Sequence, residues 1–268
     1  MSSAELEDRF QAVRDFAVRA GRGTLRYFQS STLQVDRKSD ESPVTVADRE
    51  AEQQLRGWIA ERFPQDGVLG EEFPETPGTS GYRWIVDPID GTKSFIAGVP
   101  LFGTMVAVEH DGQAIIGAVY IPGLDEGIYA GKGKGAWHFR GEAAPTPARV
   151  AEHVSLGDAI FVTSEIKTFD RRQARGVYES LERSVFVTRT WGDCYGYLLV
   201  ATGRAHLMID PIMNVWDAAA IQPIMEEAGG VFTDWQGTPT IHSGEGIGTV
   251  PALLDEILQR TRNAPRLN

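Results

Sequence analysis

The change in hydrophobic period along the chain most constrains its fold. Apolar residues recur at helical spacing from residue 5 to about residue 28, and again from residue 47 to residue 59, where Pro64 closes the pattern. Short β-type runs follow, separated by turn residues such as Asp111-Gly112. These runs cover residues 68–69, 84–86, 103–108, 114–121 and 127–130. Two helices, a polar loop at residues 36–43 between them and then a sheet are predicted.

The second half of the chain alternates β-type and helical segments. Strand-like residues are 160–163, 185–188, 207–209 and 231–232, and helical patterns cover 170–181, 193–202, 217–228 and 253–260. The polar stretch near residues 140–157 divides the chain into lobes of about 1–145 and 146–268, but it does not resemble a long disordered linker. We therefore expect a single domain over residues 1–268, built from layers of helices and sheets.

Composition narrows the classes of function. Cys194 is the one cysteine in 268 residues, which excludes an internal disulfide and a Cys-rich zinc site and fits a reducing compartment. No targeting segment and no apolar stretch of membrane-spanning length is recognisable, so a soluble, cytoplasmic protein is expected. The net charge of −11 disfavours binding to nucleic acid and to anionic membranes. It also repels anionic substrates, so a phosphate ester would need metal cations to screen it.

One segment, Trp84-Ile-Val-Asp-Pro-Ile-Asp-Gly-Thr92, predicts a metal site. An apolar strand ends at Asp87, Pro88 is predicted to force a turn, and Asp90 follows three residues on. Both carboxylates can then face one cleft. Hard divalent cations prefer several oxygen ligands, and Mg²⁺ pairs one or two carboxylates with waters and substrate phosphate. The backbone carbonyl of Ile89 offers a further oxygen.

Gly91 and Thr92 follow directly and predict a phosphate site beside the metal site. Their backbone N–H groups lie in a predicted tight turn, where a glycine lets the chain approach an anion closely. The alternative interpretation is an Asp-Pro turn in which an Asp side chain caps its own backbone. For an isolated motif of this kind, the alternative is the commoner outcome.

Three further acidic positions lie at predicted element boundaries, where site residues on α/β scaffolds tend to lie. Glu71 follows a strand end, and its alternative role is a solvated surface pair with Glu72. Asp217 begins an apolar helix, where it would otherwise compensate the helix dipole. Asp48 lies three residues after Thr45, a spacing that also fits a capping box.

Several of these segments together resemble the inositol monophosphatase superfamily of lithium-sensitive, Mg²⁺-dependent phosphatases. Their order and spacing match across nearly the whole chain. The segments are Ser42-Pro-Val-Thr-Val-Ala-Asp48, Gly70-Glu-Glu-Phe73, Trp84-Ile-Val-Asp-Pro-Ile-Asp-Gly-Thr92, and Val215-Trp-Asp-Ala-Ala219 with Glu227-Ala-Gly-Gly230. The resemblance implies a phosphomonoesterase with that superfamily's fold, an α+β sandwich of alternating α/β/α/β/α layers.

The resemblance also implies which residues hold the metal ions. Glu71, Asp87 and the Ile89 carbonyl would bind one Mg²⁺, and Asp87, Asp90 and Asp217 a second. A third, weaker ion would depend on Glu71. Two to three Mg²⁺ ions per active site, inhibition by Li⁺ and a homodimer are expected on the same basis.

Catalytic and phosphate-binding roles follow from the same resemblance. Asp48 and Thr92, with Glu71, would be catalytic residues that orient the attacking water, and Asp90 with the Gly91 and Thr92 amides would hold the phosphate. Divalent cations activate water near neutral pH and neutralise a departing alkoxide. Catalysis would therefore depend mainly on positioning and charge stabilisation.

Within the superfamily, Gly192-Asp-Cys-Tyr-Gly-Tyr197 and the strand ending at Asp210 resemble the histidinol-phosphate phosphatases of histidine biosynthesis. Histidinol phosphate carries an ammonium group and an imidazole, with which acids outside the metal set can pair. Asp193 and Asp210 are the predicted partners, and Asn214 is a further candidate for substrate contact. Alternatively, Asp193 is a helix N-terminal acid and Asp210 a turn former. Asp210 stands where that subfamily has a glutamate, and Trp216 where it has a tyrosine.

Three hypotheses remain open at this point. The first is hydrolysis of L-histidinol phosphate to L-histidinol and phosphate. The second is hydrolysis of an inositol phosphate or another small ester, such as a 3′-phosphoadenosine phosphate or fructose bisphosphate. The third is a catalytically silent relative that acts as a regulatory binding protein, whose expected signature is the loss of metal acids. All the predicted metal acids are present here.

Overall fold

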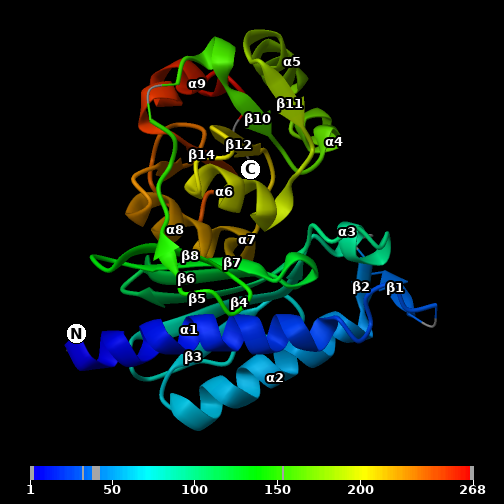
Figure 1. Ribbon diagram of the computed structural model, residues 1–268, viewed down its shortest axis with the longest axis vertical. Helices are drawn as coiled ribbons and strands as arrows, with labels where there is room; N and C mark the ends of the chain where they lie inside the picture. Colours follow the sequence, from blue (N-terminus) through cyan, green and yellow to red (C-terminus); the bar gives the residue numbers. More distant parts are fainter. Residues whose placement is uncertain (1–2, 32, 38–42, 153, 266–268) are drawn as a thin grey trace.

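Two long helices form the first layer of the structure, a computed structural model that describes residues 3–31, 33–37, 43–152 and 154–265. α1 (Ser3–Thr24) and α2 (Val46–Arg62) lie side by side against one face of the first sheet (Figure 1). α1 ends at Thr24 rather than near residue 28, because turns take over from there. The predicted apolar stripe of α1 is buried and consists of Phe10, Val13, Phe16, Ala17 and Ala20.

The first sheet has seven strands in the order β3-β4-β5-β6-β7-β8-β9. β3 pairs with β4 in parallel, and the other neighbouring pairs are antiparallel. Side chains of a strand alternate between faces, so Trp84 packs with α1 and α2 while Ile85 packs with the next layer. The strands are β3 (Gly67–Gly70), β4 (Tyr82–Asp90), β5 (Gly103–His110), β6 (Gln113–Ile121), β7 (Glu126–Gly131), β8 (Gly135–Arg140) and β9 (Thr146–Pro147).

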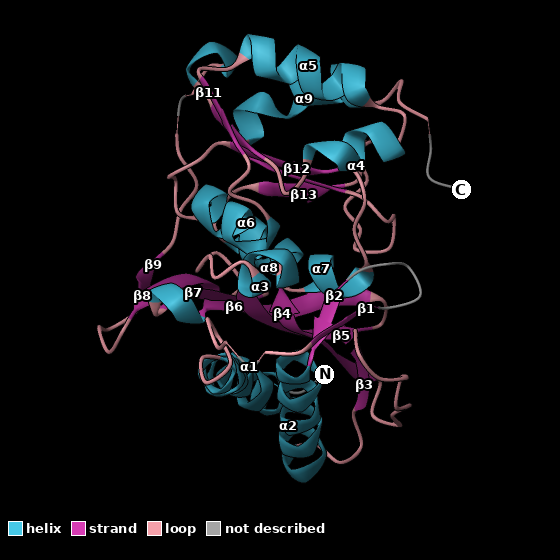
Figure 2. Cartoon of the chain, turned by 90° about the vertical axis from the view of Figure 1, so that its right-hand side faces the viewer, coloured by secondary structure: helices cyan, strands magenta, loops and turns pink. Residues whose placement is uncertain are grey.

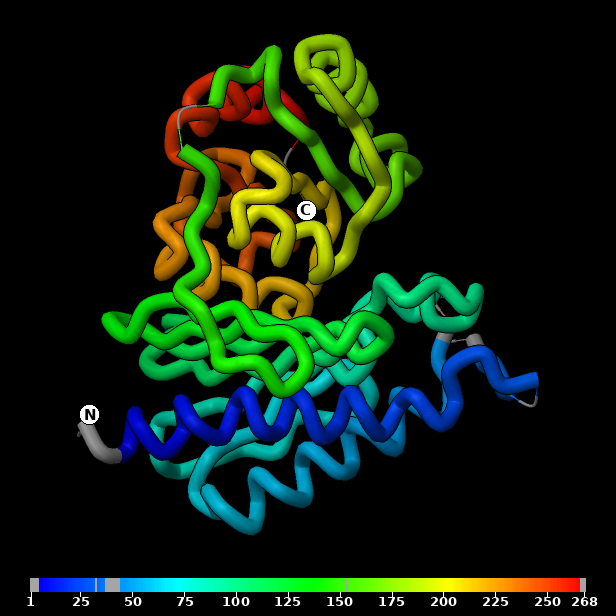
Figure 3. The backbone as a smooth tube through the Cα atoms, viewed as in Figure 1, coloured from blue at the N-terminus to red at the C-terminus, as the bar shows by residue number. Residues whose placement is uncertain are grey.

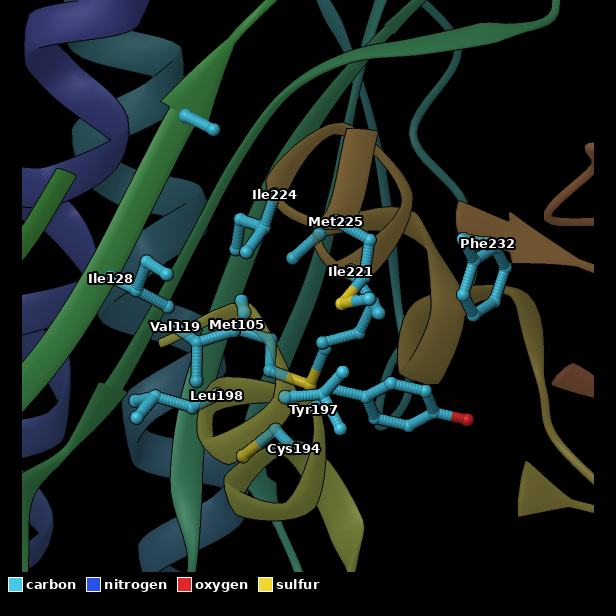
Figure 4. Packing of buried hydrophobic residues seen from close by; sticks show 14 of the residues in the cluster. Met105, Val119, Ile128, Cys194, Tyr197, Leu198, Ile221, Ile224, Met225 and Phe232 are labelled. Atoms are coloured by element: carbon cyan, nitrogen blue, oxygen red, sulfur yellow. The ribbon is translucent and has the colours of Figure 1, made fainter. Parts of the chain in front are cut away.

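The middle layer consists of α6 (Asp193–Ala201), α7 (Val215–Ala219) and α8 (Ile221–Glu227), which lie between the two sheets (Figure 2). The backbone of β6 closely approaches the residue between α7 and α8. A Cβ at Gly117 would lie 2.2 Å from the Ala220 carbonyl oxygen. Figure 4 shows the shared core, in which the sheet and helix side chains are Met105, Val119, Ile128, Leu198, Ile221 and Ile224. The packing of this shared core fixes α6 and α7 over the first sheet.

The second sheet has five strands in the order β11-β10-β12-β14-β13. β10 pairs in parallel with β11 and β12, whereas β14 is antiparallel to β12 and β13. Helices α4 (Ile166–Arg171), α5 (Arg175–Ser184) and α9 (Leu254–Thr261) cover its outer face (Figure 2). The strands are β10 (Ile160–Val162), β11 (Val187–Arg189), β12 (Leu207–Asp210), β13 (Val231–Thr233) and β14 (Gly246–Thr249). The layer order is therefore α/β/α/β/α, and the predicted fold class is confirmed.

Two predicted helices are wrong as single segments. Residues 170–181 divide between α4 and α5, because Gln173 adopts a left-handed φ of 59°. Residues 217–228 divide between α7 and α8. Pro223 has no N–H to donate to the Ala219 carbonyl, so the helical ladder is interrupted there.

Several short elements were not predicted. β1 (Val35–Arg37) and β2 (Pro43–Thr45) pair within the predicted polar loop at residues 36–43, and residues 38–42, including Ser42 of the first family motif, lie outside the described residues. β8, β9 and β14 were also missed. Short 3₁₀ helices are η1 (Pro122–Leu124), η2 (Leu156–Asp158) and η3 (Pro251–Leu253).

Figure 3 shows the chain leaving the first sheet after β9 and running along one side of the molecule to the second sheet. The division into lobes near residue 145 stays a prediction. Among the described residues, no helix is both long and apolar enough to cross a membrane.

Candidate active site

An irregularity in β4 brings Asp87 and Asp90 to the same face of the sheet. In a regular strand, residues three apart point to opposite faces. Asp87 is paired with Met105 and Asp90 with Gly103, so β4 holds one residue more than β5 over this stretch. Such a bulge lets both aspartates face one way. The predicted turn at Pro88 is therefore wrong: β4 continues to Asp90, because a bulge tolerates a residue without an N–H.

Asp217 joins these two aspartates from the middle layer. One carboxylate oxygen from each of Asp87, Asp90 and Asp217 lies within 4.8 Å of the others. Asp217 is the third residue of α7 and accepts the Asn214 N–H at 2.7 Å. Asp90 accepts the Cys194 N–H at the start of α6. Three elements, β4, α6 and α7, therefore hold the cluster in place.

Burial and mutual repulsion raise the pKa values of these three aspartates. Burial is the larger cause at Asp87 and Asp90, whose pKa values lie well above the usual range; Glu71 adds to the effect at Asp87 and Asp193 to that at Asp90. Burial likewise raises the pKa of Asp217 to about 7. A divalent cation would relieve this repulsion, and carboxylates are the hard oxygen donors that Mg²⁺ prefers. The donor set therefore fits Mg²⁺.

Asp48 lies in the first turn of α2, and its charge adds to the raised pKa of Asp87. Asp48 Oδ2 accepts the Thr45 N–H at 2.8 Å, and the predicted capping box is present. Its Oδ1 is buried and has no hydrogen-bond partner within the described part of the chain. Burial raises the pKa of Asp48 to about 6, and the charge of nearby Glu71 adds to this. Oδ2 is thus held by Thr45, while Oδ1 accepts no hydrogen bond from the described residues.

The acids open onto a cavity of about 360 Å³. Its wall combines the end of β4 and the start of α3 (Thr92–Ile96) with segments of the second half of the chain, from residues 164–168, 190–197 and 210–217. The predicted site residues that line it are Glu71, Asp87, Ile89, Asp90, Gly91, Thr92, Asp193, Asp210, Asn214 and Asp217. In the described part of the chain, Asp48 is the one predicted site residue that does not line it.

Gly91 and Thr92 form the corner between β4 and α3. Gly91 has a φ of 84°, a left-handed conformation that favours glycine. A Cβ at this position would lie 2.9 Å from Asp193 Oδ2. The Thr92 hydroxyl donates to the Ile89 carbonyl at 3.1 Å, so its oxygen lone pairs can still accept a hydrogen bond.

Ser164 connects the two acids that were predicted to contact substrate. Its Oγ donates to Asp210 Oδ1 at 2.7 Å and accepts the Asp193 N–H at 2.9 Å. Burial raises the pKa of Asp210 to about 7 and also raises that of Asp193. Sequence reasoning missed Ser164, although it follows directly on the predicted strand 160–163, at a strand end where site residues are common.

An ion pair at the cavity mouth was also missed. Lys93 of α3 pairs with Glu165, the N-cap residue of α4, and both line the cavity. Lys93 follows a strand of the first sheet and Glu165 a strand of the second, and the two residues are 72 positions apart. No local sequence pattern indicates that these two positions meet.

Residues 5–266 match the model of the inositol monophosphatase family. The chain belongs to the inositol monophosphatase family. It is 44% identical to a histidinol-phosphatase of Chlorobaculum parvum, over 88% of this chain and 90% of that protein. It is 37% identical to a histidinol-phosphatase of Mycobacterium tuberculosis, over 91% of this chain and 94% of that protein. The solved structure of an inositol monophosphatase from Zymomonas mobilis covers 98% of this chain and 100% of its own, with a TM-score of 0.83 at 30% identity.

This inositol monophosphatase family member is a phosphoric monoester hydrolase. The resemblance stated from the sequence motifs is confirmed. A phosphate ester is its class of substrate, and the cluster of Asp87, Asp90 and Asp217 lines the cavity described above.

Proposed function

We propose that the chain hydrolyses L-histidinol phosphate to L-histidinol and phosphate in a Mg²⁺-dependent reaction. One observation carries this proposal: Asp193 and Asp210 line the same cavity as Asp87, Asp90 and Asp217 but lie outside their cluster. A substrate with positive charge next to its phosphate would use acids in both places. The two histidinol-phosphatases, at 44% and 37% identity, support the same substrate.

Asp87, Asp90 and Asp217 would hold Mg²⁺, with Glu71 and the Ile89 carbonyl as further ligands. When bound, the metal supplies Lewis-acid charge for the phosphate and the leaving oxygen. The mutual repulsion of these acids favours the binding of a cation, because burial and neighbouring charges raise the pKa values of Asp87 and Asp90. Two to three Mg²⁺ ions per site, inhibition by Li⁺ and a homodimer remain expectations from the family resemblance.

Asp48 and Thr92 would orient the attacking water. The Thr92 hydroxyl gives its proton to the Ile89 carbonyl, which leaves its oxygen to accept a hydrogen bond from water. Asp48 has an unused buried oxygen and a pKa of about 6, which suits a proton acceptor near neutral pH. The Gly91 and Thr92 N–H groups, at the open end of α3, would bind phosphate oxygens.

Asp193 and Asp210 would recognise the rest of the substrate. Ser164 orients both, through the Asp210 carboxylate and the Asp193 N–H. An ammonium group placed beside them would favour their ionised forms, and charge-assisted hydrogen bonds of this kind are stronger than neutral ones. Asn214, at the same cavity, is a further candidate for contact with substrate.

An inositol phosphate is the second candidate substrate. The likeness to the Zymomonas mobilis inositol monophosphatase, which covers almost the entire chain, favours it. An inositol ring needs hydroxyl partners, for which a single acid would suffice. The two cavity acids at Asp193 and Asp210 therefore favour the cationic substrate over this one.

Phosphate release by the metal-stripped protein tests the proposal. Protein dialysed against EDTA should release no phosphate from histidinol phosphate, and added Mg²⁺ should restore release. Ca²⁺ at the same concentration serves as a charge control. Release that is equal in EDTA and in Mg²⁺, or absent with histidinol phosphate under both conditions, would contradict it.

A further inference from the structure

A fully buried glutamate on α2 contacts the loop that carries Glu71. The Glu52 side chain is 0% exposed and lies one helical turn after Asp48. Its Oε2 accepts the Glu72 N–H at 2.7 Å, and its Oε1 accepts the Phe73 N–H at 3.3 Å. Burying a carboxylate is unfavourable unless it is paired. The two backbone N–H groups of this loop offset the unfavourable burial of the Glu52 carboxylate.

Arg56, one turn further along α2, completes the contact. Its Nε donates to Glu52 Oε1 at 2.8 Å. Its two terminal nitrogens donate to the Phe73 carbonyl at 3.0 Å and to Thr76 Oγ1 at 3.1 Å. The Glu52–Arg56 pair thus binds both N–H and C=O groups of the loop, from residue 72 to residue 76.

Glu71 lies between a residue that packs against the Glu52 carboxylate and one that donates a hydrogen bond to it. Before it, Gly70 packs so closely that a Cβ there would lie 2.1 Å from Glu52 Oε1, so glycine is required. After it, Glu72 donates its N–H to the same carboxylate. The backbone before Glu71 is held by the pairing of Gly70 with Val86 between β3 and β4, and the backbone after it by the bond to Glu52, while the Glu71 carboxylate lines the cavity.

We propose that Glu52, with Arg56, is a positioning residue that aims the Glu71 carboxylate at the metal site. The inference rests on the proposed function, because it takes Glu71 as a metal ligand. α2 then contributes two residues to the site, because it carries Asp48 as well as Glu52. Residues that orient metal ligands typically change metal affinity by about 10–100-fold when they are replaced.

The variant Glu52→Gln tests the inference by Mn²⁺ binding, measured from the electron paramagnetic resonance signal of free Mn²⁺. A glutamine side chain keeps the volume, but its NH₂ group is a donor. It would replace an acceptor oxygen that faces Arg56 Nε or the N–H of Glu72 or Phe73. We expect the Kd for Mn²⁺ to rise at least about tenfold. The variant should remain folded by circular dichroism in EDTA.

Glu109→Gln is the matched control. Glu109 is also a buried glutamate, 5% exposed, and it also pairs with an arginine, because Arg83 Nε donates to it at 2.7 Å. Its other partner is His242, and none of these three residues is among those that line the cavity in the described part of the chain. We expect this variant to bind Mn²⁺ with a Kd within about twofold of the original. An equal loss of affinity in both variants would overturn the inference.

A folded Glu52→Gln protein that binds Mn²⁺ as tightly as the original would also overturn it. If that variant does not fold, Arg56→Gln decides, with Arg204→Gln as its control. Arg204 donates to the buried Glu126 at 2.7 Å, and neither of these two residues is among the described residues that line the cavity. Weaker Mn²⁺ binding by Arg56→Gln alone supports the inference, and unchanged binding overturns it. A failure of the unsubstituted protein to bind Mn²⁺ would instead overturn the metal site of the proposed function, and this inference with it.

Discussion

Replacing Asp217 by asparagine should stabilise the protein when no metal is bound. Asp217 is partly buried at the start of α7, and its ordinary pKa of 3.8 is raised to about 7, mainly by burial. Above pH 7 the folded protein must therefore carry a charge that its surroundings disfavour. Asparagine has nearly the same shape, carries no charge, and its side-chain oxygen can still accept the Asn214 N–H.

The size of the effect follows from the difference between the two pKa values. About three pKa units, at about 1.4 kcal/mol each, give an upper limit of about 4 kcal/mol in the free energy of unfolding. Solvent screens part of this at a partly exposed carboxylate, so we expect about 2 kcal/mol. For a protein of this size, that corresponds to a rise in Tm of about 4–8 °C.

The sign of the pH dependence provides the control. A carboxyl group whose folded pKa is raised contributes full stability below its unfolded pKa, and this contribution is lost as the pH rises through the folded pKa. The advantage of Asp217→Asn should therefore be near zero at pH 4 and complete above about pH 7. Thermal denaturation in EDTA at pH 4, 6 and 8 measures it. Added Mg²⁺ at pH 8 should raise the Tm of the original protein much more than that of the variant.

A lower Tm for Asp217→Asn than for the original protein in EDTA at pH 8 would refute this reasoning. So would an advantage that is equal at pH 4 and pH 8, because a pH-independent gain cannot come from a carboxyl group that titrates in this range.

Three further substitutions test other parts of the site. Asp90→Asn should abolish turnover while the circular dichroism spectrum stays unchanged, because it removes a proposed metal ligand without changing volume; an unchanged rate would refute the metal assignment. Asp193→Ala should raise KM for histidinol phosphate more than KM for glycerol phosphate, and equal effects would exclude pairing with the ammonium group. Gly91→Ala should lower both stability, by about 1–2 kcal/mol, and kcat, because φ is 84° and the new Cβ meets Asp193. Gly133→Ala, with φ of 74° and open space around it, should lower stability alone; a similar loss of kcat in both variants would contradict a local role for Gly91.

The layers of the fold were predictable because they depend on hydrophobic period. The apolar stripe of α1 and the short β-type runs after α2 each show one period over their whole length, so their class and order could be inferred. Single-residue effects were less accessible. The interruption at Pro223 and the left-handed Gln173 each divided a predicted helix, although the propensity of the flanking residues remained helical.

The candidate site residues could be named from the sequence, but their geometry could not. Asp87 and Asp90 stand out in sequence, yet their shared direction depends on one extra residue in β4 relative to β5, which only the pairing register reveals. Ser164 and Glu165 reach the cavity from a different sheet, and Glu52 acts through the backbone of a distant loop. These roles arise from long-range packing, which local patterns do not encode.

The comparison of two substrates tests the central claim most directly. The measurement is kcat/KM of the unsubstituted protein for histidinol phosphate and for inositol 1-phosphate, at the same Mg²⁺ concentration and pH. A hydrogen bond to a charged group contributes about 1.5–3 kcal/mol, so pairing with Asp193 or Asp210 predicts a preference for histidinol phosphate of at least about tenfold. A higher kcat/KM for inositol 1-phosphate would contradict the proposed function.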